Sequence, residues 1–396
     1  MSHYERILII GGGEKILSGA KESGLEVISI QKQEQFKESF FQYADKTFVF
    51  DYEEVEALLP IVKGIYEAYQ FQYVISMTET GLIPAALIND MLGLPGNSVD
   101  TVRLLKDKLA MRCLLNSKGI SRVIAESGKT RDDIEKFGNA NGWPIIVKPI
   151  DGAGSFGIFC INDLSQIDSA WKEIQDLNLG SFIMEEFLQG PEVSVEAFSS
   201  NGNHVVVAIT DKLTLPNFVE IGHSVPAQIN ETIKDEIVET VVAMLDAVGL
   251  KNGPSHTEIR LTKNGPRIVE SHNRVGGDKI HDLVEYVYGI DMVAMACASP
   301  FGRGDALTSP PKSKGGAAIR FFTPPTGSVK AIGGVEEIKE HPAVKEIVVS
   351  VQVGSNINPI VHSPDRKGYI IVQAKDAQET ISLCDELAQK IKITIE

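Results

Sequence analysis

The first hundred residues alternate short apolar runs with amphipathic segments, and this alternation limits the choice of fold more than any other feature. The apolar runs have the length of strands, and the segments between them repeat their apolar residues at helical spacing. Strands that alternate with helices are typical of a parallel α/β sheet, because parallel neighbours need a crossover connection. We expect strands at residues 6–10, 25–30 and 73–77 and helices at 14–22 and 53–69.

The next stretch combines helix and strand patterns in a smaller unit. Residues 97–119 begin with helix-capping side chains, carry leucines at helical spacing and end in glycine, which predicts one long helix with Lys106 and Lys108 in its middle. Further expected elements are helices at 130–141 and 164–176 and strands at 145–149, 157–161 and 181–188. This order predicts a small α+β unit.

Alternation with a period of two follows Pro191 and indicates an antiparallel sheet. The expected strands of this sheet cover residues 192–198, 204–210, 255–261 and 267–274. The last part of the chain predicts a compact closing lobe. Its expected elements are strands near 317–322, 346–353 and 369–374 and a helix at 376–392.

A lysine and a glycine-rich loop follow the apolar run at 145–149. Lys148 precedes Gly152, Gly154 and Gly157. Glycine lowers the steric barrier to positive φ, so the backbone N–H groups of such a loop can converge on a phosphate. An ordinary glycine-rich hairpin turn is the alternative for these residues alone.

A hairpin further along the chain brings acidic residues together. If residues 263–265 form a three-residue loop, the register places Glu258 opposite Glu270 and His256 opposite His272. The period of two then puts these four side chains on one face of the sheet. Apposed carboxylates repel each other unless a cation lies between them, so we expect a divalent cation here.

Two metals compete in this interpretation. The two histidines and two glutamates could form the zinc site of a hydrolase. Magnesium instead prefers carboxylate oxygens and bridges to substrate phosphates. Lys148 with its loop, and Arg274 on the same face of the hairpin, supply phosphate-binding groups. These groups favour a magnesium–nucleotide site.

The acidic composition argues against two classes of partner. The net charge is -15 and the isoelectric point is about 5.1. Nucleic acids and anionic membranes are bound through basic patches, so we expect neither partner. The four cysteines, at positions 113, 160, 297 and 384, lie too far apart to predict a zinc ribbon or a disulfide framework. No apolar run has the length of a membrane span, and we expect a cytoplasmic protein.

Five motifs occur in one order along the chain. They are Lys108, Lys148 with its glycine loop, MEEFLQGPEVSVE (184–196), GPSHTEIRL (253–261) and VESHNRVGGD (269–278). This set resembles the ATP-grasp superfamily of carboxylate–amine ligases and is most similar to the bacterial L-amino-acid ligases that make dipeptides. The resemblance covers nearly the whole chain.

The resemblance implies an α/β fold with α+β subdomains, the ATP-grasp fold. An N-terminal parallel, Rossmann-like domain would cover residues 1–97. A linker helix and a small lid subdomain would cover 98–189, and a large subdomain with an antiparallel sheet and the metal site would cover 190–310. A C-terminal closing lobe would cover 311–396.

The resemblance also implies a role for each motif residue. ATP would be held by Lys108, Lys148, Gly152, Gly154, Ser155, Gly157, the hinge run Glu185, Glu186, Phe187 and Leu188, and Glu192 on the ribose hydroxyls. Glu258 and Glu270 would hold Mg²⁺, with Mn²⁺ as an alternative. Catalytic roles would fall to Arg274, Lys148 and His256, and substrate contacts to Glu79, His256, His272, Arg274, Gly276 and Gly277.

The sequence departs from the family pattern at one position. His272 stands where asparagine commonly lies, and Asn273 comes one place later. Histidine is not a routine magnesium ligand, so His272 could contact the metal, a substrate or neither. Glu79 could equally be a helix-initiating residue before Gly81.

The implied reaction joins an amino-acid carboxylate to an amine, which the resemblance assigns to a second amino acid. ATP would phosphorylate the carboxylate, and the amine would displace phosphate from the acylphosphate, with ADP as the other product. Three alternatives remain open: a carboxylase or formyl-type ligase of the purine-synthesis or biotin-carboxylase kind, a zinc hydrolase, and a nucleotide-binding regulatory module. The identity of the two substrates and the formation of a homodimer are also left open.

Overall fold

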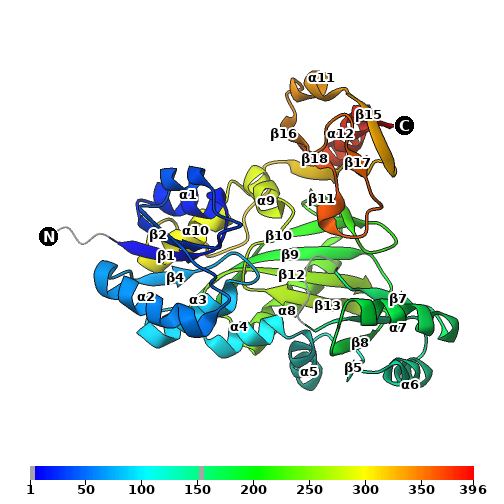
Figure 1. Cartoon of the computed structure of the whole chain (residues 1–396), viewed down its shortest axis with the longest axis horizontal. Coiled ribbons are helices and arrows are strands. Elements are labelled where there is room, and N and C mark those ends of the chain that lie inside the picture. Colours follow the sequence, from blue (N-terminus) through cyan, green and yellow to red (C-terminus); the bar gives the residue numbers. More distant parts are fainter. Residues whose placement is uncertain (1–4, 151–155) are drawn as a thin grey trace.

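The computed structural model describes residues 5–150 and 156–396, and Figure 1 shows the parts of the molecule in space. The N-terminal part is a parallel sheet of order β3-β2-β1-β4, which confirms the predicted α/β arrangement. Its strands are β1 (Arg6–Ile10), β2 (Glu26–Gln31), β3 (Lys46–Val49) and β4 (Tyr73–Ile75), and its helices are α1 (Glu14–Glu22), α2 (Val55–Tyr69) and α3 (Leu82–Leu92).

The central strand β1 explains why this sheet is covered on both faces. Ile7 and Ile9 pack into one apolar core, and Leu8 and Ile10 pack into another. The first core also contains residues of α9 (Ile280–Tyr288) and α10 (Met292–Ala298), which lie far along the chain. The N-terminal sheet is therefore completed by helices from the predicted large subdomain, and α1 and α10 lie side by side in Figure 1.

The predicted single helix at 97–119 is wrong, because the chain forms two helices. These are α4 (Val99–Lys106) and α5 (Lys108–Lys118), and Asp107 between them has an extended backbone with ψ of 98°. The Asp107 carboxylate accepts a hydrogen bond from the Ala110 N–H at 2.9 Å and so caps α5. At the break, the Lys108 N–H donates to the carbonyl of Ile150, at 3.2 Å, instead of continuing the helix.

A small four-stranded sheet of order β5-β8-β6-β7 forms the lid unit. Its elements are β5 (Ala125–Gly128), α6 (Arg131–Asn141), β6 (Ile145–Pro149), β7 (Phe159–Ile161), a short 3₁₀ helix (Leu164–Gln166), α7 (Ile167–Asp176) and β8 (Phe182–Glu186). α6 and α7 bury their apolar faces in one core with this sheet. The unit lies at the opposite end of the molecule from β1 (Figure 1).

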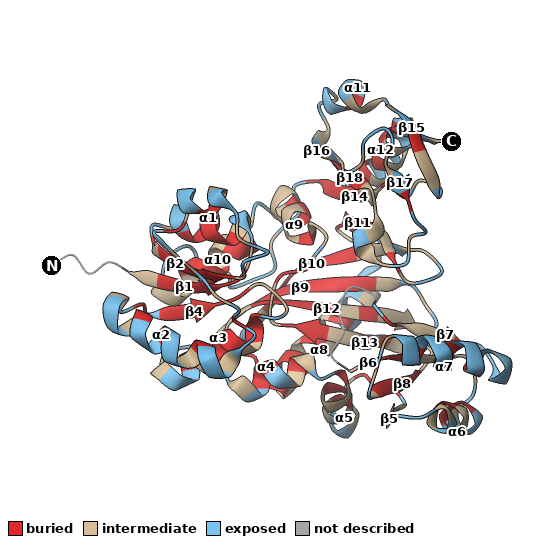
Figure 2. Ribbon diagram, in the orientation of Figure 1, coloured by how far each residue is buried: buried red, intermediate tan, exposed pale blue. Residues whose placement is uncertain are grey.

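An eight-stranded sheet of order β13-β12-β9-β10-β11-β14-β18-β16 joins the rest of the chain. The first five strands in chain order are β9 (Glu192–Ser200), β10 (Asn203–Thr214), β11 (Glu220–Val225), β12 (Gly253–Thr262) and β13 (Gly265–His272), and α8 (Glu231–Val248) packs on them. Figure 2 shows that these strands are buried along most of their length.

The C-terminal residues extend the same large sheet. β14 (Gly316–Phe321), β16 (Val344–Val349) and β18 (Gly368–Ala374) continue it, and α12 (Ala377–Lys390) packs against β14 and β18. The remaining elements are β15 (Gly327–Gly333), α11 (Val335–Lys339), β17 (Asn356–Ile357) and β19 (Lys392–Ile395). Hydrogen bonds therefore cross the predicted boundary near residue 310, because β14 pairs with β11.

The β12–β13 hairpin has a shorter loop than predicted. Thr262 pairs with Gly265, so the loop has two residues and the predicted three-residue loop is wrong. A bulge between Glu258 and Ile259 then shifts the register by one residue. As a result, Glu258 still faces Glu270 and His256 still faces His272, and these predicted pairs are confirmed.

No helix among residues 5–150 and 156–396 is both long and apolar enough to cross a bilayer.

The contact between α1 and α10 offers a test of the packing. A Cβ atom added at Gly19 would lie 3.2 Å from the Cα of Ala294, so Gly19→Leu should destabilise the fold by about 1–3 kcal/mol through overpacking. Gly64→Leu, on a helix position with no neighbour within 4 Å, is the matched control. It should be neutral or stabilise by about 0.5–1 kcal/mol, since glycine weakens a helix. Urea unfolding followed by circular dichroism measures both changes, and equal stability of the two variants would contradict this packing.

Candidate active site

A row of charged side chains crosses one region of the large sheet. Its members come from five neighbouring strands, in the order β13, β12, β9, β10 and β11. They are Glu270, Glu258, Glu192, Lys212 and Glu220. These side chains are largely buried, so each charge must find a partner inside the protein.

Two cavities meet at this row. The first is lined by Ile146, Lys148, Ile158, the hinge run Glu185 to Leu188, Glu192, Phe218, Glu220, Glu258, Arg260 and Val269. The second is lined by Lys212, Glu220, His223, His256, Glu258, Glu270, His272, Arg274, Gly277, Asp278, Ile280 and Ser363. Glu220 and Glu258 border both cavities, so the two spaces adjoin.

The first cavity brings most of the predicted ATP-binding residues together. Its apolar walls and the polar hinge suit a flat heteroaromatic ring. Lys108 forms an ion pair with Glu270 nearby, in which Nζ lies 3.0 Å from Oε2. Gly157 has a φ of +68°, in agreement with the positive φ expected for the glycine-rich loop. Gly152, Gly154 and Ser155 lie outside the described residues.

The Glu185 side chain is committed to two cations. Its Oε2 lies 2.6 Å from Lys148 Nζ, and its Oε1 accepts a hydrogen bond from Arg112 Nε at 2.9 Å. Burial by itself would raise the pKa of Glu185, but these two cations outweigh it and lower the pKa. Glu185 therefore holds Lys148 in place at the cavity wall, and Arg112, which the sequence analysis missed, fixes the second oxygen of the Glu185 carboxylate.

The two predicted metal ligands are both ionised. Burial opposes their charge, but Lys212 lowers the pKa of Glu258, and Lys108 together with His272 lowers the pKa of Glu270. They face each other across the hairpin and line the same cavity. Two ionised carboxylates at adjoining positions fit the oxygen ligands that Mg²⁺ prefers.

The histidines are bound to carboxylates. His256 Nδ1 lies 2.8 Å from Glu196 Oε1, and this partner explains the pKa of His256. Burial alone would lower that pKa, but the Glu196 and Glu258 carboxylates raise it to about 9. His272 Nε2 lies 3.1 Å from Glu270 Oε1, and its pKa is also raised, because Glu270 outweighs burial.

The alternative zinc site finds no support in this geometry. Within residues 5–150 and 156–396, the three-carboxylate set of Glu192, Glu220 and Glu258 brings its ligand atoms within 4.8 Å of one another. His256, Glu270 and His272 are not part of this set. His272 instead lies beside Glu270 as a hydrogen-bonding neighbour.

Glu79 connects the N-terminal domain to the site. It follows β4, and its Oε2 accepts a hydrogen bond from Arg274 Nε at 2.8 Å and lies 3.1 Å from His272 Nδ1. Lys106 Nζ also lies 3.3 Å from Glu79 Oε1 and donates to the Glu79 carbonyl. Partial burial would raise the pKa of Glu79, but His272, Arg274 and Lys106 lower it, so Glu79 is a partly buried anion that orients Arg274.

The predicted glycines differ in their surroundings. A Cβ atom at Gly276 would lie 2.8 Å from His256 Nδ1 and 3.1 Å from Glu196 Oε2, so a side chain there would displace the His256–Glu196 pair. Gly277 has open space around its Cβ position and lines the second cavity. Of Gly276 and Gly277, Gly276 is the one that close packing requires.

The C-terminal lobe also contributes residues that the sequence analysis missed. Arg366 donates two hydrogen bonds of 2.6 Å to the Asp278 carboxylate and stacks on Phe321 at 3.7 Å from the ring centroid. His223 Nε2 lies 3.3 Å from the same carboxylate. The bidentate pair closes one wall of the second cavity, and no local pattern marks Arg366 in the sequence.

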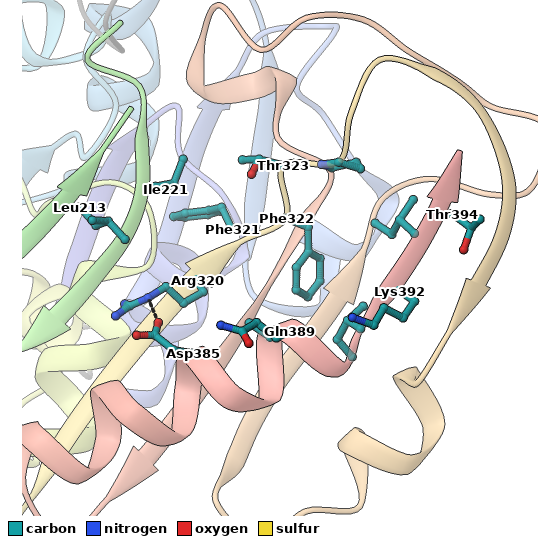
Figure 3. A pocket seen from close by; sticks show the side chains of 14 residues that line it. Leu213, Ile221, Arg320, Phe321, Phe322, Thr323, Asp385, Gln389, Lys392 and Thr394 are labelled. Carbon is teal, nitrogen blue, oxygen red and sulfur yellow. Dashed lines mark hydrogen bonds and ion pairs between the residues drawn. The ribbon is translucent and has the colours of Figure 1, made fainter. Parts of the chain in front are cut away.

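A further hollow lies between the large sheet and α12, as Figure 3 shows. Arg320 and Asp385 form an ion pair of 2.6 Å at its edge, and Phe321, Phe322 and Lys392 contribute to its lining. None of the predicted site residues lines this hollow. It is therefore separate from the candidate active site.

The His256–Glu196 pair predicts a pH-dependent stability in protein free of divalent cations. The pKa of His256 is raised in the folded state, so the pair stabilises fully below the unfolded pKa of about 6.5 and its effect is lost as the pH rises through about 9. Glu196→Gln should therefore be destabilised relative to the wild type by about 1–3 kcal/mol near pH 6.5, and the difference should shrink above pH 9. Urea unfolding across this range measures it, with the exposed Glu231→Gln as a control that should show no such trend. A constant difference from pH 6 to pH 10 would contradict the assignment.

Three family models match successive parts of the chain. They are described as ATP-grasp N-terminal domain (residues 17–96), ATP-grasp domain (residues 141–282) and L-amino acid ligase C-terminal domain 2 (residues 320–396). These three segments run in the same order as the N-terminal sheet, the lid with the large sheet, and the C-terminal lobe.

Individual relatives and a solved structure agree with these matches. The alanine–anticapsin ligase of Bacillus subtilis (strain 168) is 29% identical over 266 residues, which cover 61% of this chain and only 56% of that protein's length. The L-arginine-specific L-amino acid ligase of Bacillus subtilis is 24% identical over 84% of this chain and 82% of its own. The crystal structure of an L-amino acid ligase from Bacillus licheniformis superposes with a TM-score of 0.87 at 24% identity, covering 100% of both chains.

The superposition confirms the predicted ATP-grasp fold, and the matched segments extend from the N-terminal sheet to the last strand. The chain therefore carries an ATP-grasp domain at residues 141–282, preceded by an ATP-grasp N-terminal domain and followed by a C-terminal domain of the L-amino acid ligase type.

Proposed function

We propose that this protein is an ATP-dependent ligase that joins the carboxylate of one amino acid to the amine of another and releases ADP and phosphate. The observation that carries the proposal is the shared wall of the two cavities. An apolar cavity with the hinge run meets, at Glu258, a cavity lined by carboxylates, histidines and Arg274. A nucleotide base in the first cavity would place the phosphates beside the charged groups of the second.

The cations around the second cavity suit phosphoryl transfer to a carboxylate. Both reactants are anions, so positive groups fixed near them lower the barrier to their approach. Arg274 would contact the transferring phosphoryl group, and Lys148 and Lys108 would contact the nucleotide phosphates. Glu79 and Glu185 hold Arg274 and Lys148 in position before the substrates bind. Such preorganisation means that these groups need little rearrangement during the reaction.

Glu258 and Glu270 would hold Mg²⁺, which offsets phosphate charge when bound; Mn²⁺ accepts the same oxygen ligands. His272 would act on this pair indirectly, through its hydrogen bond to Glu270. We also predict a cytoplasmic location for the protein. Assembly as a homodimer also stays a prediction.

His256 has a narrower role than a general base. With a pKa of about 9 it is a cation at neutral pH, so it cannot accept the proton of the attacking amine. A buried imidazolium instead suits an anion, such as the donor carboxylate or a phosphoryl oxygen. We therefore assign His256 to anion binding.

The rival activities have less support. The zinc hydrolase lacks a converging set of histidine and carboxylate ligands in the described part of the chain. A carboxylase of the biotin-carboxylase kind shares the fold, as a biotin carboxylase from Campylobacter jejuni superposes with a TM-score of 0.74 at 18% identity. The C-terminal domain match favours amino-acid ligation over this activity.

The products of ATP cleavage test the reaction. With a panel of amino-acid pairs, the protein should release ADP and phosphate only when a suitable pair is present, and mass spectrometry should detect the dipeptide. Hydroxylamine in place of the second amino acid should give the hydroxamate of the donor, because it intercepts the acylphosphate. Release of AMP and pyrophosphate would rule out this mechanism.

A variant of Arg274 tests its role in phosphoryl transfer. Arg274→Met should lower both ligation and hydroxamate formation by at least about 100-fold, since one preorganised charge is commonly worth 10²–10³ in rate. Arg303→Met breaks a surface ion pair with Glu5 and a hydrogen bond to the Ser23 carbonyl, both outside the two cavities, so it is the matched control and should keep full activity. Equal activity of the two variants would contradict the role of Arg274.

A further inference from the structure

Lys212 is a buried lysine that contacts three carboxylates, and the mechanism above does not use it. It lies on β10 with its side chain only 2% exposed. Its ammonium lies 2.7 Å from Glu192 Oε1 and 3.2 Å from Glu220 Oε1, and it also donates to Glu258 Oε1. Lys212 is therefore a buried ammonium group that carboxylates contact on three sides.

The three carboxylates around Lys212 have the spacing of a metal site. They come from β9, β11 and β12, and one oxygen from each lies within 4.8 Å of the others. Three carboxylate oxygens so close together repel strongly unless a cation lies among them. An ammonium ion supplies one charge and three hydrogen-bond donors, which matches three oxygen acceptors. The ammonium of Lys212 thus occupies the position that a divalent cation would take.

Glu258 belongs to two groups of carboxylates. On one side it faces Glu270 across the hairpin, and on the other it contacts Lys212. A metal ion in the set of Glu192, Glu220 and Glu258 would draw Glu258 away from Glu270. It would also occupy Glu192, which lines the predicted nucleotide cavity.

We propose that Lys212 is a positioning residue that determines where divalent cations bind. Its ammonium fills the set of Glu192, Glu220 and Glu258 and keeps a metal ion out of it. The Glu258–Glu270 pair is then the place that accepts the metal, and Glu192 stays available to the nucleotide. The proposal rests on the proposed function only in taking Glu258 and Glu270 as metal ligands.

Substitution of Lys212 should create a metal site. Lys212→Met keeps most of the volume of the side chain but shortens it by one atom and removes the charge, so the three carboxylates should bind one additional Mn²⁺ per chain in the absence of nucleotide. Equilibrium dialysis and the electron paramagnetic resonance signal of free Mn²⁺ measure the number of bound ions. Mn²⁺ should also raise the melting temperature of Lys212→Met more than that of the wild type.

Two control variants separate this effect from a general disturbance. Lys212→Arg keeps the positive charge and should bind no additional ion. Lys212→Met combined with Glu220→Gln removes one of the three charged oxygens and should lose most of the additional Mn²⁺ affinity. Glu220 is neither a predicted metal ligand nor a catalytic residue, so its loss tests the three-carboxylate set alone.

Two results would overturn the proposal. One is a folded Lys212→Met that binds the same number of Mn²⁺ ions as the wild type, and the other is an additional ion that persists in the double variant. If Lys212→Met is unfolded without metal, millimolar Mn²⁺ should restore its folded circular dichroism spectrum, and failure to do so also overturns the proposal. The ion count needs no turnover, so a failed ligase assay would leave this inference standing.

Discussion

The repulsion between Glu258 and Glu270 is the constraint around which the site is built. The hairpin places these two carboxylates opposite each other in a largely buried position, where like charges are costly. Their charge is balanced by side chains from separate parts of the chain. Lys108 begins the helix α5, Lys212 lies on β10, and His272 lies two residues beyond Glu270 on the same hairpin. The site thus forms only when these elements have come together.

The same charges connect the parts of the molecule. Glu79 of the N-terminal domain holds Arg274, and Arg366 of the C-terminal lobe holds Asp278 only four residues later. The middle and the last residue of the motif VESHNRVGGD are therefore fixed by side chains from other parts of the chain. A substrate that binds beside Arg274 would contact side chains whose positions depend on these ion pairs. A change in how the domains are arranged would therefore change the geometry of the site.

Two local predictions failed in instructive ways. The helix expected at 97–119 breaks at Asp107, because that residue caps a new helix while the Lys108 N–H bonds to Ile150 in the lid. Helical periodicity continues through the break, so only the contact with the lid reveals it. In the hairpin, the loop is one residue shorter than predicted and a bulge offsets the difference. The predicted pairing of Glu258 with Glu270 is correct because the bulge compensates for the shorter loop, and the sequence alone does not reveal this bulge.

The sequence by itself determined the order of the elements, the parallel N-terminal sheet, the antiparallel hairpin and the positions of Lys148, Glu258, Glu270 and Arg274, because periodicity and motif spacing are local properties of a chain. The tertiary structure alone decided the partners of these residues. Arg112, Lys212 and Arg366 are single charged residues without a local signal. Each acquires its role from a distant carboxylate only once the chain is folded: Arg112 pairs with Glu185 at a separation of 73 residues, Lys212 with Glu258 at 46 and Arg366 with Asp278 at 88. Burial raises the cost of an unpaired charge, so the folded interior selects these distant pairs, whereas the unfolded chain leaves every one of them solvated.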